Sequence, residues 1–264
     1  MILLFQELLF KIFVTFLNLK NRNIFNKKSN MVITRLHILI FSTIFFILLN
    51  TKDVFEEKIV FGEPVFVKKV ALTFDDGPHP YFTENILEII SKYNIKATFF
   101  LVGIQAEKYP QLVKLLAENE RCKIGNHTYS HKNLTKLSDL EILNELKTTQ
   151  EILNSISGKK NVISYFRPPG GHYNDKVLNI ADKLNLKIVL WSIFTNDHSE
   201  KITEKELISK ITASLSSDKE IILLHSGSIT TLKCLPKIIE ILKEKNYEFV
   251  TIDEILEDET YIVN

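Results

Sequence analysis

The sequence predicts an α/β fold, a distorted (β/α) barrel with about seven parallel strands that follows an N-terminal hydrophobic segment. Short apolar runs alternate with amphipathic runs from Val65 onward, as in parallel strands covered by helices. The chain has 264 residues, 45% of them hydrophobic, which is enough for one full barrel. Seven such units favour an irregular barrel, one unit short, over an open doubly wound sheet.

The first 50 residues predict a signal or membrane anchor. Residues 36–49, "LHILIFSTIFFILL", form an apolar run with basic residues before it and Asp53, Glu56 and Glu57 after it. This order is typical of a segment that leaves the body of the chain outside the cytoplasm. The absence of a small-residue cleavage pattern favours an uncleaved anchor over a cleaved signal. Met31 is an alternative start of translation.

These features divide the chain into three parts. We expect an N-terminal segment at 1–50, a linker at 51–64 and a catalytic domain at 65–258. The formal net charge of +1 is uneven along the chain. Glu7 is the only acidic residue in the basic first segment, so the remainder is net acidic. An acidic body without a basic stripe argues against nucleic acid as a partner.

Each expected element has its own local signal. Apolar runs rich in β-branched and aromatic residues predict strands at 67–74, 96–102, 122–126, 163–166, 187–193, 221–224 and 248–252. Helices are expected after Thr83, from Pro110, at 138–157, and at about 174–184, 203–215 and 231–245. The third of these carries a capping box formed by Ser138 and Glu141. Cys122 and Cys234 fall on a strand and a helix and are expected to be separate structural thiols.

Chemically active side chains stand at the carboxyl ends of the expected strands, where parallel barrels carry their sites. They are Asp75 and Asp76 after the first strand, His127 and His131 after the third, Arg167 at the end of the fourth, Asp197 after the fifth, and His225 at the end of the sixth.

The stretch "ALTFDDGPHP" (71–80) places two adjacent carboxylates directly after an apolar strand. Taken alone, it is typical of a solvated turn. "HTYSH" adds His127 and His131, which we expect to point the same way from a helical turn and to bind one divalent cation. Two histidines and one carboxylate leave positions open for water and substrate, as in catalytic sites. Zinc fits best, and cobalt, manganese and iron stay open.

Five motifs stand in an order that identifies a family. They are "TFDDGP" (73–78), "HTYSH" (127–131), "RPPGG" (167–171), "WSIFTNDH" (191–198) and "ILLHS" (222–226). Through them the chain from about Val67 to Ile255 resembles the polysaccharide deacetylase family, the NodB-homology domain. The resemblance implies a metal-dependent enzyme that removes acetyl groups from N-acetylated sugars.

The resemblance also implies roles for individual residues. Asp75 would be the general base and would be oriented by Arg167. Asp76 would be a metal ligand together with His127 and His131.

On the substrate side, His225 would be the general acid, held by Asp197. The backbone N–H of Gly170 would help to bind the oxyanion, and Leu223 would line the pocket for the acetyl methyl group. His198 stands where the family usually has the tryptophan of that pocket.

Three other positions depart from the family pattern. Gly170 replaces a common aromatic residue, which would leave a more open wall, while Phe194 and Ser226 each replace a common Asp with little expected consequence. We expect Tyr129 and Trp191 to be packing residues. His79 is expected in an exposed turn, and His172 is expected near the rim.

The expected function is hydrolysis of N-acetyl groups in peptidoglycan, at N-acetylglucosamine or N-acetylmuramic acid, on the outer face of the cytoplasmic membrane or in the cell wall. Chitooligosaccharide or an exopolysaccharide is the alternative substrate. A catalytically silent glycan-binding protein is the alternative of another class. A metal phosphoesterase is disfavoured, because the carboxylates of a second metal site are missing from the pattern.

Overall fold

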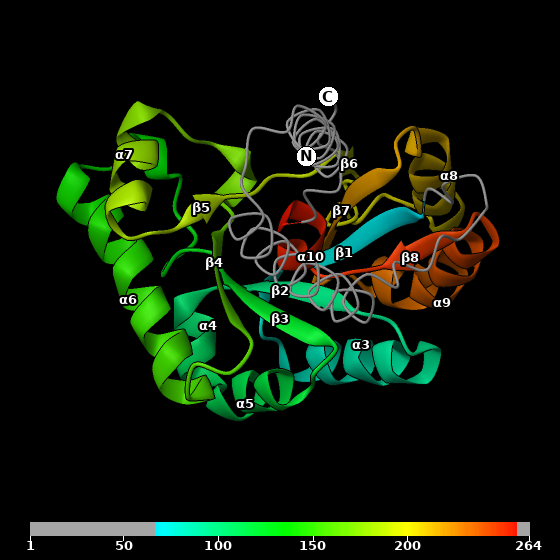
Figure 1. Ribbon diagram of the computed structural model, residues 1–264, viewed down its shortest axis with the longest axis horizontal. Helices are drawn as coiled ribbons and strands as arrows, with labels where there is room; N and C mark the ends of the chain where they lie inside the picture. Colours follow the sequence, from blue (N-terminus) through cyan, green and yellow to red (C-terminus); the bar gives the residue numbers. More distant parts are fainter. Residues whose placement is uncertain (1–66, 258–264) are drawn as a thin grey trace, which may run out of the picture. The chain divides into compact units, whose positions relative to one another are not determined.

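Strand β1 (Lys68–Gly77) lies inside the sheet, between two neighbouring strands, in the computed structural model, which describes residues 67–257 (Figure 1). The strands run in the order β5-β4-β3-β2-β1-β7-β6, all paired in parallel, and β8 pairs with the first residues of β1. The result is an α/β half-barrel. The bounds are β2 (Ala97–Leu101), β3 (Cys122–Asn126), β4 (Val162–Phe166), β5 (Lys187–Ile188), β6 (Ile193–Phe194), β7 (Lys219–His225) and β8 (Tyr247–Phe249).

Helices follow the strands and pack around them (Figure 1). The α-helices are α3 (Pro80–Tyr93), α4 (Gly103–Lys108), α5 (Pro110–Glu118), α6 (Asp139–Ser157), α7 (Asp175–Lys183), α8 (Glu204–Ser214), α9 (Ile229–Glu244) and α10 (Ile252–Glu257). Short 3₁₀ turns occupy Leu134–Lys136 and Pro169–Gly171. The expected helices are therefore present, and α4 and α10 are additional short ones.

The strand predicted at 187–193 was wrong as a single element. The chain forms β5, which pairs with β4, and then crosses to form β6, which pairs with β7 at the other end of the path. Between them, the carbonyls of Val189 and Leu190 accept hydrogen bonds from the guanidinium of Arg167 at 3.3 and 3.0 Å. The side chain of Arg167 thus bonds the carbonyls that a neighbouring strand would otherwise use. The half-barrel therefore stays open between β5 and β6.

Two helix starts test the capping predictions. The capping box of α6 is confirmed, since Ser138 and Glu141 bond each other's backbone N–H groups. Thr83 was wrong as the cap of the first helix, because α3 begins three residues earlier at Pro80. His79 is the cap: its ring nitrogen accepts from the N–H of Tyr81 at 3.2 Å, and Thr83 Oγ1 accepts from the N–H of His79 at 2.8 Å.

Alternation along β1 separates the two faces of the sheet. Val70, Leu72 and Phe74 pack outward under the helices. The intervening residues, Thr73 and Asp75 among them, face the barrel interior, because successive side chains of a strand point to opposite sides. Hydrophobic packing against the helices therefore holds β1 in place, while its other face delivers a carboxylate to the interior.

Both cysteines are free and buried, Cys122 in β3 and Cys234 in α9, as predicted. Burial raises the pKa of the Cys122 thiol to about 12, so it stays protonated as a packing residue.

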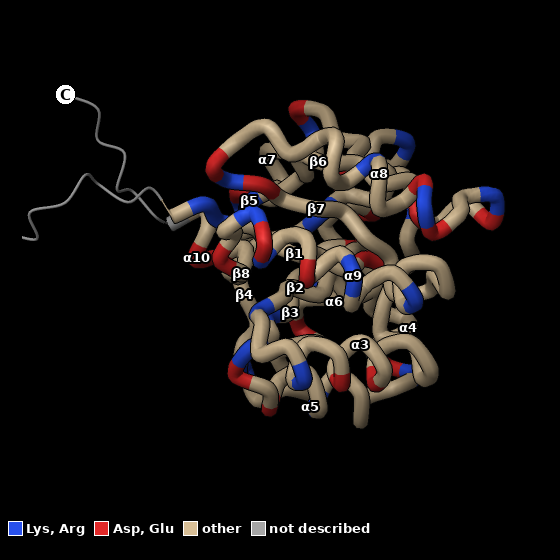
Figure 2. Tube along the Cα trace, turned by 90° about the vertical axis from the view of Figure 1, so that its right-hand side faces the viewer, with Lys and Arg blue, Asp and Glu red and all other residues tan. Residues whose placement is uncertain are grey.

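Acidic and basic residues are interspersed along the same elements (Figure 2). Across residues 67–257, none of the helices has the length and apolar character needed to cross a membrane. The expected anchor at 36–49 lies outside the described residues.

Candidate active site

One cavity at the carboxyl ends of the strands collects most of the residues that the sequence singled out. Its volume is about 680 Å³. It is lined by Asp75, Asp76, His127, His131, Gly170, Trp191, Phe194, His198, Leu223 and His225. Arg167 and Asp197 lie behind this lining and bond Asp75 and His225. All ten predicted site residues therefore come together in one place.

The two adjacent carboxylates reach the same histidine. The distance from His127 Nε2 is 3.3 Å to Asp76 Oδ1 and 3.7 Å to Asp75 Oδ2. Regular alternation would send neighbouring side chains to opposite faces. Asp76 instead has φ 70, a left-handed conformation that Asp tolerates better than most residues, and the pairing register with β2 shifts at this point. The end of β1 is thus bent so that both carboxylates serve one site.

The loop that carries His127 and His131 is not helical, and the expected helical turn was wrong. Thr128 and His131 have φ 65 and 59. The loop is closed by the side chain of Asn126, which accepts from the N–H of Thr128 at 2.9 Å, and by Thr128 Oγ1, which accepts from the N–H of His131 at 3.1 Å. The two imidazoles still converge, with ring centroids 5.0 Å apart.

Asp76, His127 and His131 together fit a divalent metal ion. His131 Nε2 lies 3.1 Å from Asp76 Oδ1, and one ligand atom from each residue lies within 4.8 Å of the other two. His127 Nδ1 donates to the carbonyl of Arg167 at 2.7 Å. Because a carbonyl can only accept, the proton is on Nδ1, and Nε2 keeps its lone pair for a metal.

The charges of this cluster support one another. Partial burial would raise the pKa of Asp76, but the contacts with His127 and His131, which are hydrogen bonds whenever these rings carry a proton on Nε2, outweigh burial and hold this pKa well below its ordinary value. The hydrogen bond to Asp76 raises the pKa of His131 in return. Asp76 is therefore a carboxylate at all physiological pH values, which is the protonation state that a ligand requires.

Asp75 is held by a fully buried arginine. Arg167 has 0% exposure, and its Nη1 donates to Asp75 Oδ1 at 2.9 Å and to Thr73 Oγ1 at 2.7 Å. Burial lowers the pKa of Arg167, while the carboxylate of Asp75 opposes that shift. The guanidinium also lies 4.4 Å from the ring centroid of Phe100. This pairing fixes the orientation of Asp75 and leaves Oδ2 toward His127.

His225 is held in the same manner by Asp197. Its Nδ1 donates to Asp197 Oδ1 at 2.6 Å, and Asp197 Oδ2 accepts from the N–H of His225 at 2.8 Å. Burial acts to lower the pKa of His225, but the hydrogen bond to Asp197 outweighs burial and raises this pKa. Burial would raise the pKa of Asp197, but the hydrogen bond from His225 outweighs burial, and the pKa of Asp197 is lowered. The carboxylate of Asp197 therefore orients the imidazole of His225 and favours its protonated form.

Two aromatic residues in the cavity wall were missed as site residues. Trp191 was expected only to pack and Phe194 to have little consequence, yet both line the cavity. Their rings stack with centroids 5.9 Å apart. His198 lies beyond them, 4.9 Å from His225 between ring centroids. Their position in the "WSIFTNDH" motif, at the end of the fifth predicted strand, was the signal that could have found them.

Glu145 is a further residue that sequence reasoning missed. From α6, its nearly buried carboxylate accepts from the N–H groups of Tyr129 and Ser130 at 2.8 Å each, and from the hydroxyl of Ser130. These bonds hold the middle of the loop between His127 and His131. A helical glutamate carries no local signal for such a role, because the loop that it bonds is distant in the sequence.

We expect Glu145→Met to weaken metal binding by about 10–100-fold, the usual effect of losing a group that orients metal ligands. A methionine side chain cannot accept hydrogen bonds from the N–H groups of Tyr129 and Ser130 as the carboxylate does. Competition with a chromophoric chelator measures the affinity. Glu151→Met, an exposed change on the same helix, is the control. Unchanged metal affinity in Glu145→Met would contradict the role.

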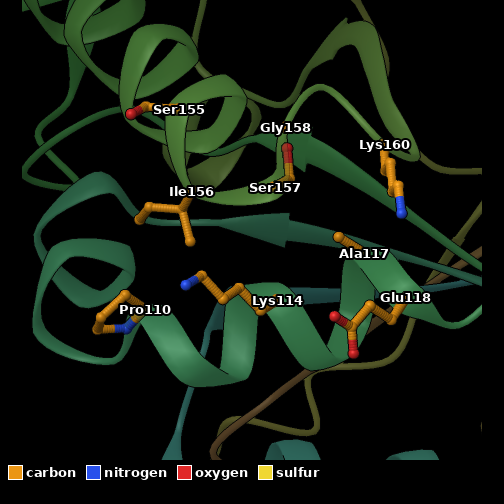
Figure 3. Close-up of a pocket in the computed structure, with 9 residues that line it drawn as sticks. All are labelled: Pro110, Lys114, Ala117, Glu118, Ser155, Ile156, Ser157, Gly158 and Lys160. Carbon is orange, nitrogen blue, oxygen red and sulfur yellow. The ribbon is translucent and has the colours of Figure 1, made fainter.

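A second cavity of about 600 Å³ lies between α5 and the end of α6 (Figure 3). Lys114, Glu118 and Lys160 are its charged lining residues, and its wall contains neither an imidazole nor a pair of carboxylates. The chemistry in the described residues is therefore concentrated in the first cavity. A carboxylate held by a buried guanidinium and an imidazole held by a carboxylate, around one possible metal site, are groups that the hydrolysis of an amide or ester can use. Fold and site define a hydrolase.

Comparisons with known proteins agree with this class. Residues 63–189 match the model of the family described as "Polysaccharide deacetylase". A peptidoglycan-N-acetylglucosamine deacetylase of Bacillus cereus is 42% identical over 196 residues, covering 73% of this chain and 70% of that protein. The chain belongs to the polysaccharide deacetylase family and is a deacetylase enzyme.

Two solved structures are also similar. A peptidoglycan N-acetylglucosamine deacetylase bound to a naphthalenyl benzamide is 41% identical, with a TM-score of 0.67 over 71% of this chain and 87% of that one. A CE4 family pseudoenzyme from Bacillus anthracis is 30% identical, with a TM-score of 0.66 over 72% of this chain and 65% of that one. The fold is therefore shared by an enzyme and by a protein described as a pseudoenzyme.

Proposed function

We propose that this protein hydrolyses the N-acetyl groups of peptidoglycan in a zinc-dependent reaction, at N-acetylglucosamine or N-acetylmuramic acid. The convergence of Asp76, His127 and His131 beside the Asp75–Arg167 pair is the observation that carries the proposal. The names of the similar proteins point to the same substrate. Zinc fits a donor set of two imidazoles and a carboxylate, and cobalt is the alternative.

In this proposal Asp75 is the general base. When bound, zinc would polarise the acetyl carbonyl and lower the pKa of water to about 7. Asp75 accepts the proton of the attacking water through Oδ2, while Arg167 holds Oδ1. The backbone N–H of Gly170 stabilises the negative charge that develops on the acetyl oxygen. Leu223, buried in the cavity wall, receives the methyl group.

His225 completes the reaction as the general acid. The C–N bond breaks, the sugar amine takes a proton from the imidazolium of His225, and acetate leaves with the oxygen of the water. Asp197 keeps the proton on Nδ1 and so directs Nε2 to the leaving amine. His198 occupies the wall beside His225 and contacts the acetamide group.

Asp197→Asn is expected to move the alkaline limb of the kcat profile to lower pH. The hydrogen bond to Asp197 raises the pKa of His225 against the effect of burial, so the acid form persists to higher pH in the natural protein. Without the carboxylate, the pKa falls and the acid is lost earlier as pH rises. Acetate release measured between pH 5 and 10, compared with Asp182→Asn as a surface control, checks this shift. An unmoved alkaline limb would show that His225 is not the acid.

Acetate release from purified peptidoglycan, chitin oligomers and acetylated xylan, with and without chelator, tests the function as a whole. The proposal expects release from peptidoglycan that stops with chelator and returns with zinc. Release from chitin oligomers or an exopolysaccharide alone would favour the alternative substrates. Glycan binding without any acetate would instead favour a catalytically silent glycan-binding protein.

We also propose that the domain acts outside the cytoplasm, attached to the membrane by residues 36–49. The apolar run and the basic residues before it support this proposal. Protease added to intact cells should remove the domain. Full protection of the domain in intact cells, with cleavage after lysis, would exclude this topology.

A further inference from the structure

One wall of the cavity extends beyond the residues used by the proposed reaction. Phe194 lines the same cavity as Asp75 and His225, yet 44% of it is exposed. A large aromatic ring therefore meets solvent at the mouth of the site. The C–H groups of a pyranose can pack on such a ring, which makes this wall suitable for a sugar next to the reacting one.

Contacts of Trp191 with neighbouring residues hold this wall in place. Trp191, on which Phe194 stacks, lies against Gly171, where a Cβ atom would come within 2.9 Å of Trp191 Cη2. The buried guanidinium of Arg167 also lies close to Trp191, 5.7 Å from its ring centroid. The loss of side-chain freedom of Phe194 on substrate binding is therefore small, because Trp191, on which it stacks, is already held in place.

A lysine that is not itself a lining residue of the cavity stands beside Phe194. Lys210 of α8 is exposed and places Nζ 5.2 Å from the ring centroid of Phe194. Within residues 67–257, no carboxylate lies within ion-pairing distance of Lys210. The acids of the first turn of α8 interact elsewhere, Glu204 with Lys233 at 4.0 Å and Glu206 with the cap residue Thr203.

The carboxylates of the cavity are, in contrast, already partnered. Asp75 pairs with Arg167, Asp76 faces His127 and His131, and Asp197 bonds His225. Lys210 is therefore a cation beside Phe194 whose charge is available to an anion from solvent.

We propose that Phe194 and Lys210 form a subsite that selects glycans carrying a carboxylate on the sugar next to the reacting N-acetyl sugar. This inference rests on the proposed N-deacetylation. The sugar ring packs on Phe194, and its carboxylate pairs with Lys210. The carboxylate is a lactyl ether acid in strands stripped of peptide, or belongs to the stem peptide in intact peptidoglycan. A neutral chitin oligomer gains only the contact with Phe194.

Fluorescence tests this subsite independently of turnover, because Trp191 is the single tryptophan of the chain and lies in the wall. The full chain is titrated with chitin pentamer and with peptidoglycan strands of similar length, with and without stem peptides. We expect Lys210→Met to weaken binding of the charged strands by about three- to fivefold, as for an exposed ion pair. Binding of chitin pentamer should not change.

Lys205→Met, an exposed change on the same helix, is the matched control and should leave both affinities unchanged. In the natural protein, 0.5 M NaCl should remove the preference for charged strands. Phe194→Ser should weaken both ligands. The strand with the larger loss in Lys210→Met identifies the source of the carboxylate.

Equal affinity of the natural protein for neutral and charged strands would overturn the subsite, as would equal losses for both ligands in Lys210→Met. Acetate release is measured in parallel. A salt-sensitive preference for charged strands without acetate release would keep the subsite and reject the proposed deacetylation. Acetate release without a preference for charged strands would keep the proposed deacetylation and reject the subsite.

Discussion

Asp75→Asn is expected to lower kcat by about 10²–10⁴-fold, the usual cost of losing a general base. The amide keeps the shape of the side chain and its contact with Arg167, but it cannot accept a proton from water. Metal content should stay near that of the natural protein, because Asp76, His127 and His131 are untouched. Acetate release and zinc bound after dialysis are measured on the same sample. Added zinc should not restore activity.

Asp76→Asn is the matched comparison, with the same chemical change one residue along the chain. It removes the carboxylate that both histidines contact, so zinc affinity should fall and excess zinc should partly restore turnover. The two variants thus separate the base from the ligand. Equal loss of zinc in both, or near-normal turnover in Asp75→Asn, would reject this division of roles.

Arg167→Met is expected to lower the free energy of unfolding by about 3–5 kcal/mol, the range for removing one partner of a buried ion pair. Arg167 is fully buried, and besides Asp75 it bonds Thr73 Oγ1 and the two carbonyls at the crossing between β5 and β6. Its loss leaves the carboxylate of Asp75 in the interior without a cation. Urea unfolding of the metal-free protein measures the change.

A double variant separates the charge of this pair from its packing. Arg167→Met combined with Asp75→Asn leaves no uncompensated charge, so it should be more stable than Arg167→Met alone. The carbonyls of Val189 and Leu190 would still lack their donors, and part of the loss should remain. A single variant within about 1 kcal/mol of the natural protein would show that Arg167 is not needed to hold the structure together.

Much of the candidate site could be predicted because it depends on local order along the chain. Apolar runs mark the parallel strands, and the residues after them must meet at one edge of the sheet. This reasoning was sufficient to bring Asp75, His127 and His225 to one cavity without any knowledge of the packing. The capping box of α6 was equally local, since both of its partners lie within one turn.

Other features depended on partners distant in the sequence. The single strand expected at 187–193 became β5 and β6 because Arg167, about twenty residues earlier, takes the carbonyls in between. The loop with His127 and His131 is closed by the local bonds of Asn126 and Thr128, and Glu145 of α6 bonds its backbone from outside the segment. No pattern within either segment encodes the bonds to Arg167 and Glu145.

The sequence by itself therefore predicted which side chains gather at the strand ends, because strand ends are marked by local periodicity, and the family resemblance supplied their expected roles as base, acid and ligands. The tertiary structure decided how they are aimed. It bends β1 at Asp76 so that two adjacent carboxylates reach one histidine. It also brings Trp191 and Phe194 into the cavity wall. Orientation arises from hydrogen bonds and packing between segments that meet only in the folded chain, and such contacts leave no periodic trace in the sequence.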